Sequence, residues 1–155
     1  MRVADVMNRQ AARLRVDDPL RLAAELLALS QASDLAVVDE DGQFVGVLSE
    51  GDLLRALMPD YTLLEDMPVS VADASAFFAT TGISRAEDPI GPLVITESIS
   101  VHPDDDLLKP AAVMVTKQIR QLPVLENGRF VGTLSRADVC WALLIDVPEG
   151  HVVPS

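Results

Sequence analysis

Apolar and polar residues follow an order along the chain that occurs twice. In the first half, an apolar lead-in at residues 3–7 precedes a strand, an amphipathic helix, two strands and a second helix. Apolar residues spaced three and four apart distinguish the helices from the strands. The predicted elements cover residues 14–16, 20–32, 35–38, 44–48 and 51–58. The last two strands flank an Asp-rich turn that ends in Gly42, so they should form a hairpin.

The second half repeats this order. Its lead-in lies at residues 93–95, and the elements that follow cover 99–101, 107–119, 123–125, 130–134 and 137–145. Pro110 should lie in the first turn of its helix, because a proline deeper in a helix removes a hydrogen bond. Each half therefore has the order β-α-β-β-α. The predicted fold class is α/β (α+β), with two repeats packed in pseudo-twofold symmetry.

The clearest mark of the repeat is a stretch that occurs as GQFVGVLSEGD at 42–52 and as GRFVGTLSRAD at 128–138. The copies share seven of eleven residues, and both Ser49 with Ser135 and Asp52 with Asp138 lie 86 positions apart. A repeat of this kind sets the architecture of a chain. The sequence divides into a first repeat at 1–58, an acidic, partly helical insertion at 59–89, a second repeat at 90–147 and a tail at 148–155.

The insertion is less regular than the repeats. Ser70 and Asp73 have the spacing of a capping box, which predicts a helix through Phe77 and Phe78 that ends at Gly82. The segment could be a partner surface, a lid over a cleft or a linker. The tail should be frayed.

Composition and charge narrow the possible partners. The formal net charge is −12 and the sequence pI is about 4.3. An acidic surface repels the phosphate backbone, which disfavours nucleic acid and anionic membranes as partners. The single cysteine, Cys140, excludes an internal disulfide and favours an intracellular protein. With neither a secretory signal nor an apolar run that could span a bilayer, the sequence predicts a soluble, cytoplasmic protein.

Residues arranged for catalysis are nearly absent. His102 lies in a loop and His151 in the tail, and neither has a partner pattern. Cys140 lies in an apolar run and is interpreted as a core residue rather than a nucleophile. The acidic run at 104–106 suits a helix N-terminus, since consecutive residues point in different directions and do not form a metal site. We expect a protein that is not an enzyme and binds no metal.

The repeated Ser-x-x-Asp has two interpretations. In the first it is a capping box, in which the serine caps the helix and the aspartate returns the bond. In the second, the helix N-terminus binds a phosphate, the serine hydroxyl adds a contact, and the aspartate accepts hydrogen bonds from a ribose diol. The repetition of the whole frame makes the second interpretation competitive.

The two copies resemble the cystathionine-β-synthase (CBS) domain, and in tandem they resemble a Bateman module. The resemblance covers residues 13–54 and 98–139 and, with the lead-ins, most of the chain. It implies binding of an adenine nucleotide (AMP, ADP or ATP) or a related adenosyl ligand in clefts between the repeats. It also implies a homodimer without chemistry of its own, which regulates another protein that the sequence does not identify.

Carried over by position, the resemblance implies a ligand site in each copy. The site in the second copy would use Ser100, Val101, Ile119, Arg120, Pro123, Thr133, Ser135, Arg136 and Asp138. The weaker site in the first copy would use Val16, Ala36, Ser49 and Asp52.

The first copy departs from the pattern in charge. Asp34 stands where the second copy has Gln121, and Glu50 stands where it has Arg136. These carboxylates would repel a phosphate, whereas Arg120 and Arg136 would attract one unless they are only solvated surface residues. We therefore expect the second copy to hold the better nucleotide site.

The closing helix at 139–145 is apolar on every side and includes Trp141. A helix that is apolar all round is buried all round, so it should form a homodimer contact. The sequence thus predicts a ligand-sensing regulatory module that acts as a homodimer. The alternative is a dimerisation or protein-interaction module with no bound nucleotide.

Overall fold

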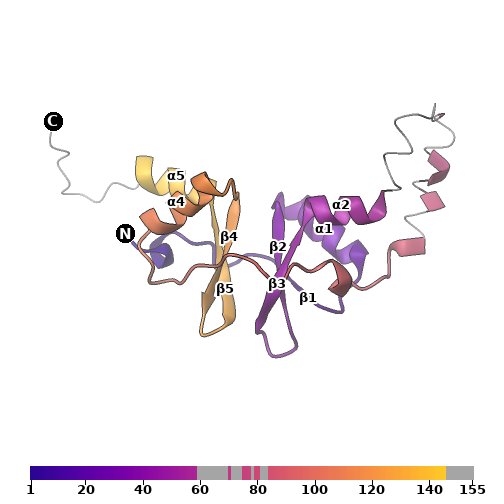
Figure 1. Ribbon diagram of the computed structural model, residues 1–155, viewed down its shortest axis with the longest axis horizontal. Coiled ribbons are helices and arrows are strands. Elements are labelled where there is room, and N and C mark those ends of the chain that lie inside the picture. The colour runs from indigo at the N-terminus through magenta and orange to yellow at the C-terminus, as the bar shows by residue number, and fades with distance from the viewer. Residues whose placement is uncertain (59–69, 71–74, 78, 81–83, 146–155) are drawn as a thin grey trace. The chain divides into compact units, whose positions relative to one another are not determined.

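The structure is a computed structural model that describes residues 1–58, 70, 75–77, 79–80 and 84–145. Its elements are the 3-10 helices η1 (Val3–Asp5) and η3 (Gly91–Leu93), the strands β1 (Arg13–Arg15), β2 (Asp34–Val38), β3 (Phe44–Ser49), β4 (Gln121–Glu126) and β5 (Arg129–Ser135), and the helices α1 (Leu20–Ser30), α2 (Glu50–Leu57), α4 (Leu108–Thr116) and α5 (Arg136–Leu144) (Figure 1). The expected capping box at Ser70, the Phe78 and Gly82 positions, and the tail with His151 fall partly or wholly outside the described residues.

The chain forms two compact units whose boundaries differ from those of the sequence repeats. One unit joins Met1–Ala11 and Gly42–Phe44 to the chain from Ile99 onward, and the other joins Ala12–Asp41 to Val45–Ser98. Each lead-in therefore belongs to the unit of the other repeat. We call these units the second-repeat unit and the first-repeat unit, after the helices they contain.

The first-repeat unit is built on a three-stranded sheet in the order β1-β2-β3. β1 and β2 are parallel and pair Leu14 with Val37, and α1 connects them. The lead-in of the second repeat adds an antiparallel bridge between Val47 and Ile95. The core consists of aliphatic side chains from both faces: Leu14, Leu20, Ala23, Leu27, Leu35, Val37, Leu48, Leu53 and Ile90.

In the second-repeat unit, β4 and β5 form an antiparallel hairpin with an irregularity between Val124 and Leu125. Val101 adds a parallel bridge to Val124 on one edge, and Asn8 adds an antiparallel bridge to Thr133 on the other. The strand expected at 99–101 is thus reduced to a single bridge. The core beneath the hairpin contains Val3, Met7, Val101, Leu107, Met114, Leu122, Val124, Leu134, Val139 and Ala142.

The helices begin where the sequence predicts and end earlier. Pro110 is the third residue of α4, in its first turn as expected. α4 ends at Thr116 rather than at 119, and Gln118 two residues beyond has a left-handed φ of 56°. Gln31 ends α1 in the same conformation, with a φ of 55°. The apolar pattern continues past both ends, because the chain turns into the next strand without a polar break. Within the described part of the chain, no helix has the length and apolar character needed to cross a membrane.

The glycines of the repeated frame have two different physical roles. Gly42 and Gly128 lie in the hairpin turns with φ of 78° and 76°, a conformation that L side chains rarely adopt. Gly46 and Gly132 lie in the strands, where the bridging lead-in passes close to the backbone. A Cβ at Gly132 would lie 2.5 Å from the carbonyl oxygen of Asn8, and one at Gly46 would overlap the carbonyl of Ile95. The frame therefore requires glycine at both places.

Replacing Gly132 with alanine should lower the free energy of unfolding by about 1–3 kcal/mol, because the new methyl group overpacks against the backbone of Asn8. Urea unfolding monitored by circular dichroism measures this loss. The matched control is Gly51→Ala in α2, where the added methyl would meet only the Arg55 side chain. That substitution should be neutral or stabilising by up to about 1 kcal/mol. Equal effects of the two substitutions would contradict the close-approach role of Gly132.

Candidate functional site

The sequence-predicted site of the second copy is centred on the junction of β5 and α5. Ser135 is the N-cap of α5, and its hydroxyl accepts a hydrogen bond from the Asp138 N–H at 3.1 Å. Asp138 Oδ2 in turn accepts from the Ser135 N–H at 2.8 Å and from its hydroxyl at 2.7 Å. The capping-box interpretation of Ser-x-x-Asp is therefore confirmed here. It uses only one oxygen of the Asp138 carboxylate.

The first copy has a related junction with one added partner. The Ser49 hydroxyl accepts from the Asp52 N–H at 3.0 Å and donates to Asp52 Oδ2 at 2.8 Å. The other oxygen, Asp52 Oδ1, accepts a hydrogen bond from Arg55 Nη2. The residue of the second copy that corresponds to Arg55 is Trp141, which has no charge to offer. Among the residues that the structure describes, Asp138 Oδ1 has no such partner.

The pKa of Asp52 lies below its ordinary value of 3.8. The hydrogen bond from Arg55 is the main cause and the one from Ser49 the second, while partial burial opposes both. Both bonds stabilise the carboxylate form. The first copy thus spends its carboxylate on an ion pair within its own helix.

The ion pair of Asp52 should make stability depend on pH. Because the folded-state pKa is lowered, the contribution of Asp52 to the free energy of unfolding is present above pH 3.8 and is lost as the pH falls through the lower folded-state value. Asp52→Asn should therefore destabilise the protein at neutral pH, and its difference from wild type should shrink in acid.

Urea unfolding at several pH values tests this dependence. The same substitution in an Arg55→Ala background should cost less at neutral pH, since the main cause of the shift is gone. A difference that grows as the pH falls below 3.8, or that Arg55→Ala leaves unchanged, contradicts the assignment.

Arg136 has neither of the roles considered for it from the sequence. Its Nε donates to the carbonyl of Ile119 at 2.7 Å, and its Nη2 donates to the carbonyl of Met114 at 3.0 Å. Its main-chain N–H donates to the carbonyl of Arg120 at 3.0 Å. A carbonyl in the last turn of a helix has no partner within that helix, and a cation there also opposes the negative end of the dipole. Arg136 therefore ties the first turn of α5 to the end of α4.

The remaining residues predicted for the second copy all lie in the same unit. The Val101 N–H donates to the carbonyl of Pro123 at 3.0 Å, and Pro123 is paired across the hairpin with Thr133. Thr133 is buried, and its backbone exchanges two hydrogen bonds with Asn8, of 2.8 and 3.0 Å. Ile119 is half-buried, whereas Ser100 and Arg120 are exposed.

In the first copy, Ser49 and Asp52 form the capped junction, and Ala36 is buried in β2 opposite Arg13. Val16 is exposed just after β1.

Two residues near these junctions were not singled out from the sequence. Asn8 lies in a lead-in whose pattern allowed a strand or a turn, and no local signal shows which strand it bridges. Arg55 could have been found, because it lies three residues after Asp52 on a predicted helix, a spacing at which opposite charges pair.

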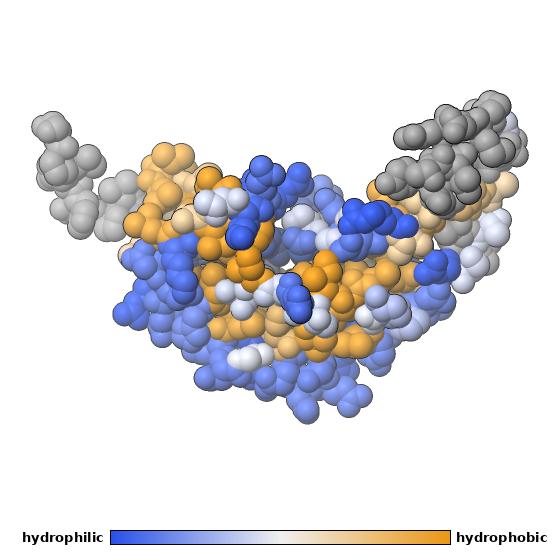
Figure 2. All heavy atoms as spheres, viewed as in Figure 1, coloured by the Kyte–Doolittle hydropathy of each residue, from blue (hydrophilic) through white to orange (hydrophobic). Residues whose placement is uncertain are grey.

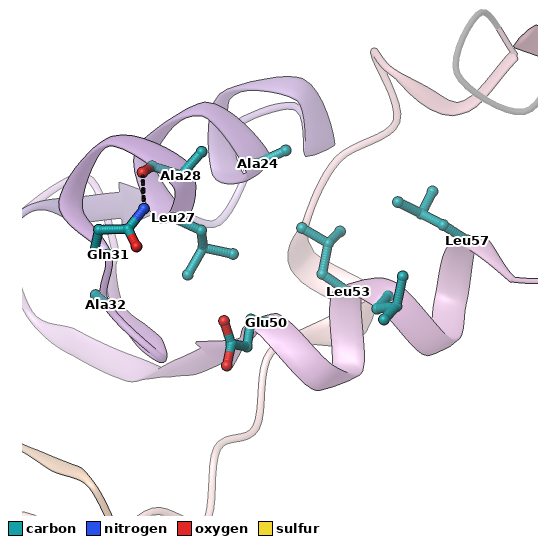
Figure 3. A pocket seen from close by; sticks show the side chains of 9 residues that line it. Ala24, Leu27, Ala28, Gln31, Ala32, Glu50, Leu53 and Leu57 are labelled. Atoms are coloured by element: carbon teal, nitrogen blue, oxygen red, sulfur yellow. Dashed lines mark hydrogen bonds between the residues drawn. The ribbon is translucent and has the colours of Figure 1, made fainter. Parts of the chain in front are cut away.

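A cavity of about 370 Å³ lies elsewhere in the first-repeat unit, between α1 and α2. Leu27 of α1 and Leu53 of α2 point into the space between the two helices, and Glu50 lies at its end (Figure 3). Gln31 donates to the carbonyl of Ala28 at 2.6 Å beside it. Ser49 and Asp52 are not among the lining residues, so this mainly apolar cavity is separate from the predicted ligand site.

The repeat architecture and the capped junction in each copy define a tandem pair of small α/β domains. The family model described as "CBS domain" matches the chain twice, at residues 3–59 and 90–145. The chain belongs to the CBS domain family and has the fold of a CBS pair.

The relatives are distant in sequence and similar in fold. The uncharacterized protein MJ1426 of Methanocaldococcus jannaschii is 23% identical over 93% of this chain and 92% of its own length. The protein MJ1404 of the same organism is 24% identical over 98% of this chain, which spans only 34% of that protein.

Two solved structures carry adenosyl ligands. The crystal structure of CBSX2 in complex with AMP matches with a TM-score of 0.69 and 24% identity, over 92% of this chain and 96% of that one. The CBS domain pair of protein MJ0100 in complex with 5′-methylthioadenosine and S-adenosyl-L-methionine matches with a TM-score of 0.65 and 18% identity, over 92% and 95%.

Proposed function

We propose that this protein is a regulatory, non-catalytic module that binds an adenine nucleotide or a related adenosyl ligand in its second repeat and acts as a homodimer. The observation that carries the proposal is the carboxylate of Asp138. Its Oδ2 is held by the cap, and its Oδ1 lacks the arginine that occupies the same oxygen in the first copy. The ligands of CBSX2 and of the MJ0100 domain pair support the adenosyl class.

The geometry gives each part of such a ligand a counterpart. The free N–H groups of the first turn of α5 suit a phosphate, because a helix N-terminus carries unpaired donors and the positive end of the dipole. Asp138 Oδ1 suits a ribose hydroxyl, since an ionised carboxylate accepts several hydrogen bonds. Ser135 acts mainly as a scaffold, because its hydroxyl already accepts from Asp138 and donates to it. Arg136 positions the first turn of α5.

The first copy is the weaker site in this proposal for two reasons. A ligand would have to displace Arg55 from Asp52, and Glu50 places a carboxylate where the second copy has Arg136. The surface ion pair alone is worth about 0.2–1 kcal/mol, so the charge of Glu50 adds to a modest barrier.

Titration of AMP, ADP and ATP by calorimetry tests the site assignment. Asp138→Ala should weaken binding about ten- to a hundredfold, because it removes a hydrogen bond to a charged group worth roughly 1.5–3 kcal/mol. The matched control is Asp52→Ala, the equivalent residue of the first copy, which should leave the affinity nearly unchanged. Weaker binding in Asp52→Ala with normal binding in Asp138→Ala would reverse the assignment.

The exposed sides of α4 and α5 support the homodimer. Val139 and Ala142 are buried under α5, but Trp141 is 54% exposed and Leu144 is 78% exposed. The chain therefore covers one side of the helix that the sequence predicts to be buried all round. Figure 2 shows hydrophobic residues gathered over these two helices. A second copy would remove this apolar surface from water.

Trp141→Asp should convert the dimer to a monomer, because it places a charge in a desolvated apolar contact. Light scattering at micromolar protein measures the mass. The control is Leu29→Asp on α1, an exposed leucine that does not line the cavity between α1 and α2; this variant should keep the dimer mass. A monomer mass for wild type would contradict the homodimer itself.

An interaction module with empty clefts is the second candidate, favoured by the same exposed apolar helices. Mass spectrometry of the native protein for co-purified nucleotide separates the two candidates. A melting temperature that rises with added nucleotide would also favour the ligand-sensing module.

A further inference from the structure

The exposed helix surfaces of the two units differ in relief. In the second-repeat unit, large apolar side chains stand out from α4 and α5; this set, which we call the ridge, is Leu108, Val115, Trp141 and Leu144. The equivalent positions of the first repeat carry smaller or charged residues: Ala28 for Val115, Arg21 for Leu108 and Arg55 for Trp141. The first-repeat unit is therefore hollow where the other unit stands out.

The hollow is the cavity between α1 and α2, which we call the groove. Its volume is about 370 Å³. Ala24 and Ala28 line it from α1, and Leu53 and Leu57 line it from α2 (Figure 3). Small residues on one wall and leucines on the other leave room for a large apolar side chain, which a well-packed interior would otherwise fill.

The charges of the two surfaces are opposite. α1 and α2 carry two basic side chains and three acidic ones, and the acidic ones are Glu25, Glu50 and Asp52. α4, with its C-cap Lys117, and α5 carry three basic side chains and one acidic one. A net positive ridge is unusual on a chain of charge −12, and it complements the groove.

We infer that the ridge of one copy docks in the groove of a second copy. This pairing rests on the homodimer proposed above and specifies which surfaces meet. Each copy offers one ridge and one groove, so two copies form two equivalent junctions of an isologous dimer. The other arrangement, ridge to ridge and groove to groove, would bring like charges together and leave both cavities facing each other.

Cysteine cross-linking distinguishes the two arrangements. Cys140 is exposed on α5 beside Trp141, and it is the only cysteine in the sequence. In wild type a short bismaleimide joins two copies only if α5 meets α5. Ala28→Cys adds one exposed thiol in the groove. The double variant Ala28→Cys with Cys140→Ser keeps the groove thiol alone and is the matched control.

The expected result is a shift to twice the chain mass for Ala28→Cys, with loss of this band in wild type and in the double variant. A strong band in wild type shows ridge to ridge, a strong band in the double variant shows groove to groove, and either overturns the inference. A dimer by light scattering that cross-links in none of the three also overturns it, since the two helix surfaces would then lie apart. A monomer mass overturns the homodimer and this pairing together.

Discussion

Backbone pairing between each hairpin and a lead-in from a distant part of the chain is the constraint on which the structure depends. Asn8 bonds Thr133 in one unit, and Ile95 bonds Val47 in the other. Both bridges require a glycine next to the paired residue, Gly132 and Gly46, because the two backbones approach too closely for a Cβ. The glycines that mark the repeat in the sequence therefore exist to admit a segment from outside it.

The Ser-x-x-Asp junction shows how one local geometry can serve structure and binding together. The cap satisfies donors at the start of a helix, and it fixes one oxygen of the aspartate while leaving the other to be used. What differs between the copies is a single position one turn later. Arg55 takes the second oxygen of Asp52, whereas Trp141 cannot take that of Asp138. A substitution on the helix surface thus changes what an identical cap can do.

Most of the fold followed from the sequence, because periodicity and turn residues are local properties. The repeat, the hairpins and the helix starts were all predicted. The helix ends were not, since Gln31 and Gln118 enter the left-handed conformation without a glycine to signal it. The exchange of the lead-ins was missed because a bridge of one residue leaves no periodic pattern.

The candidate site was predicted in its residues more than in their roles. The cap of Ser135 by Asp138 follows from spacing alone. The role of Arg136 does not, because its guanidinium binds carbonyls of Met114 and Ile119, and their proximity depends on where α4 stops. The identity of a residue shows what it can bind, but the partner it finds is set by the packing of elements far apart in the sequence.

The exchange of lead-ins has a consequence for how such a chain could arise. A protein holding one repeat would find the complement of its lead-in only in a second molecule, as in a domain-swapped dimer. Joining two repeats in one chain turns that encounter into an intramolecular one, with an effective concentration that linker length sets. Gene duplication would then relieve the unit of its dependence on protein concentration, and each copy could diverge at its exposed positions while the shared glycines stay fixed.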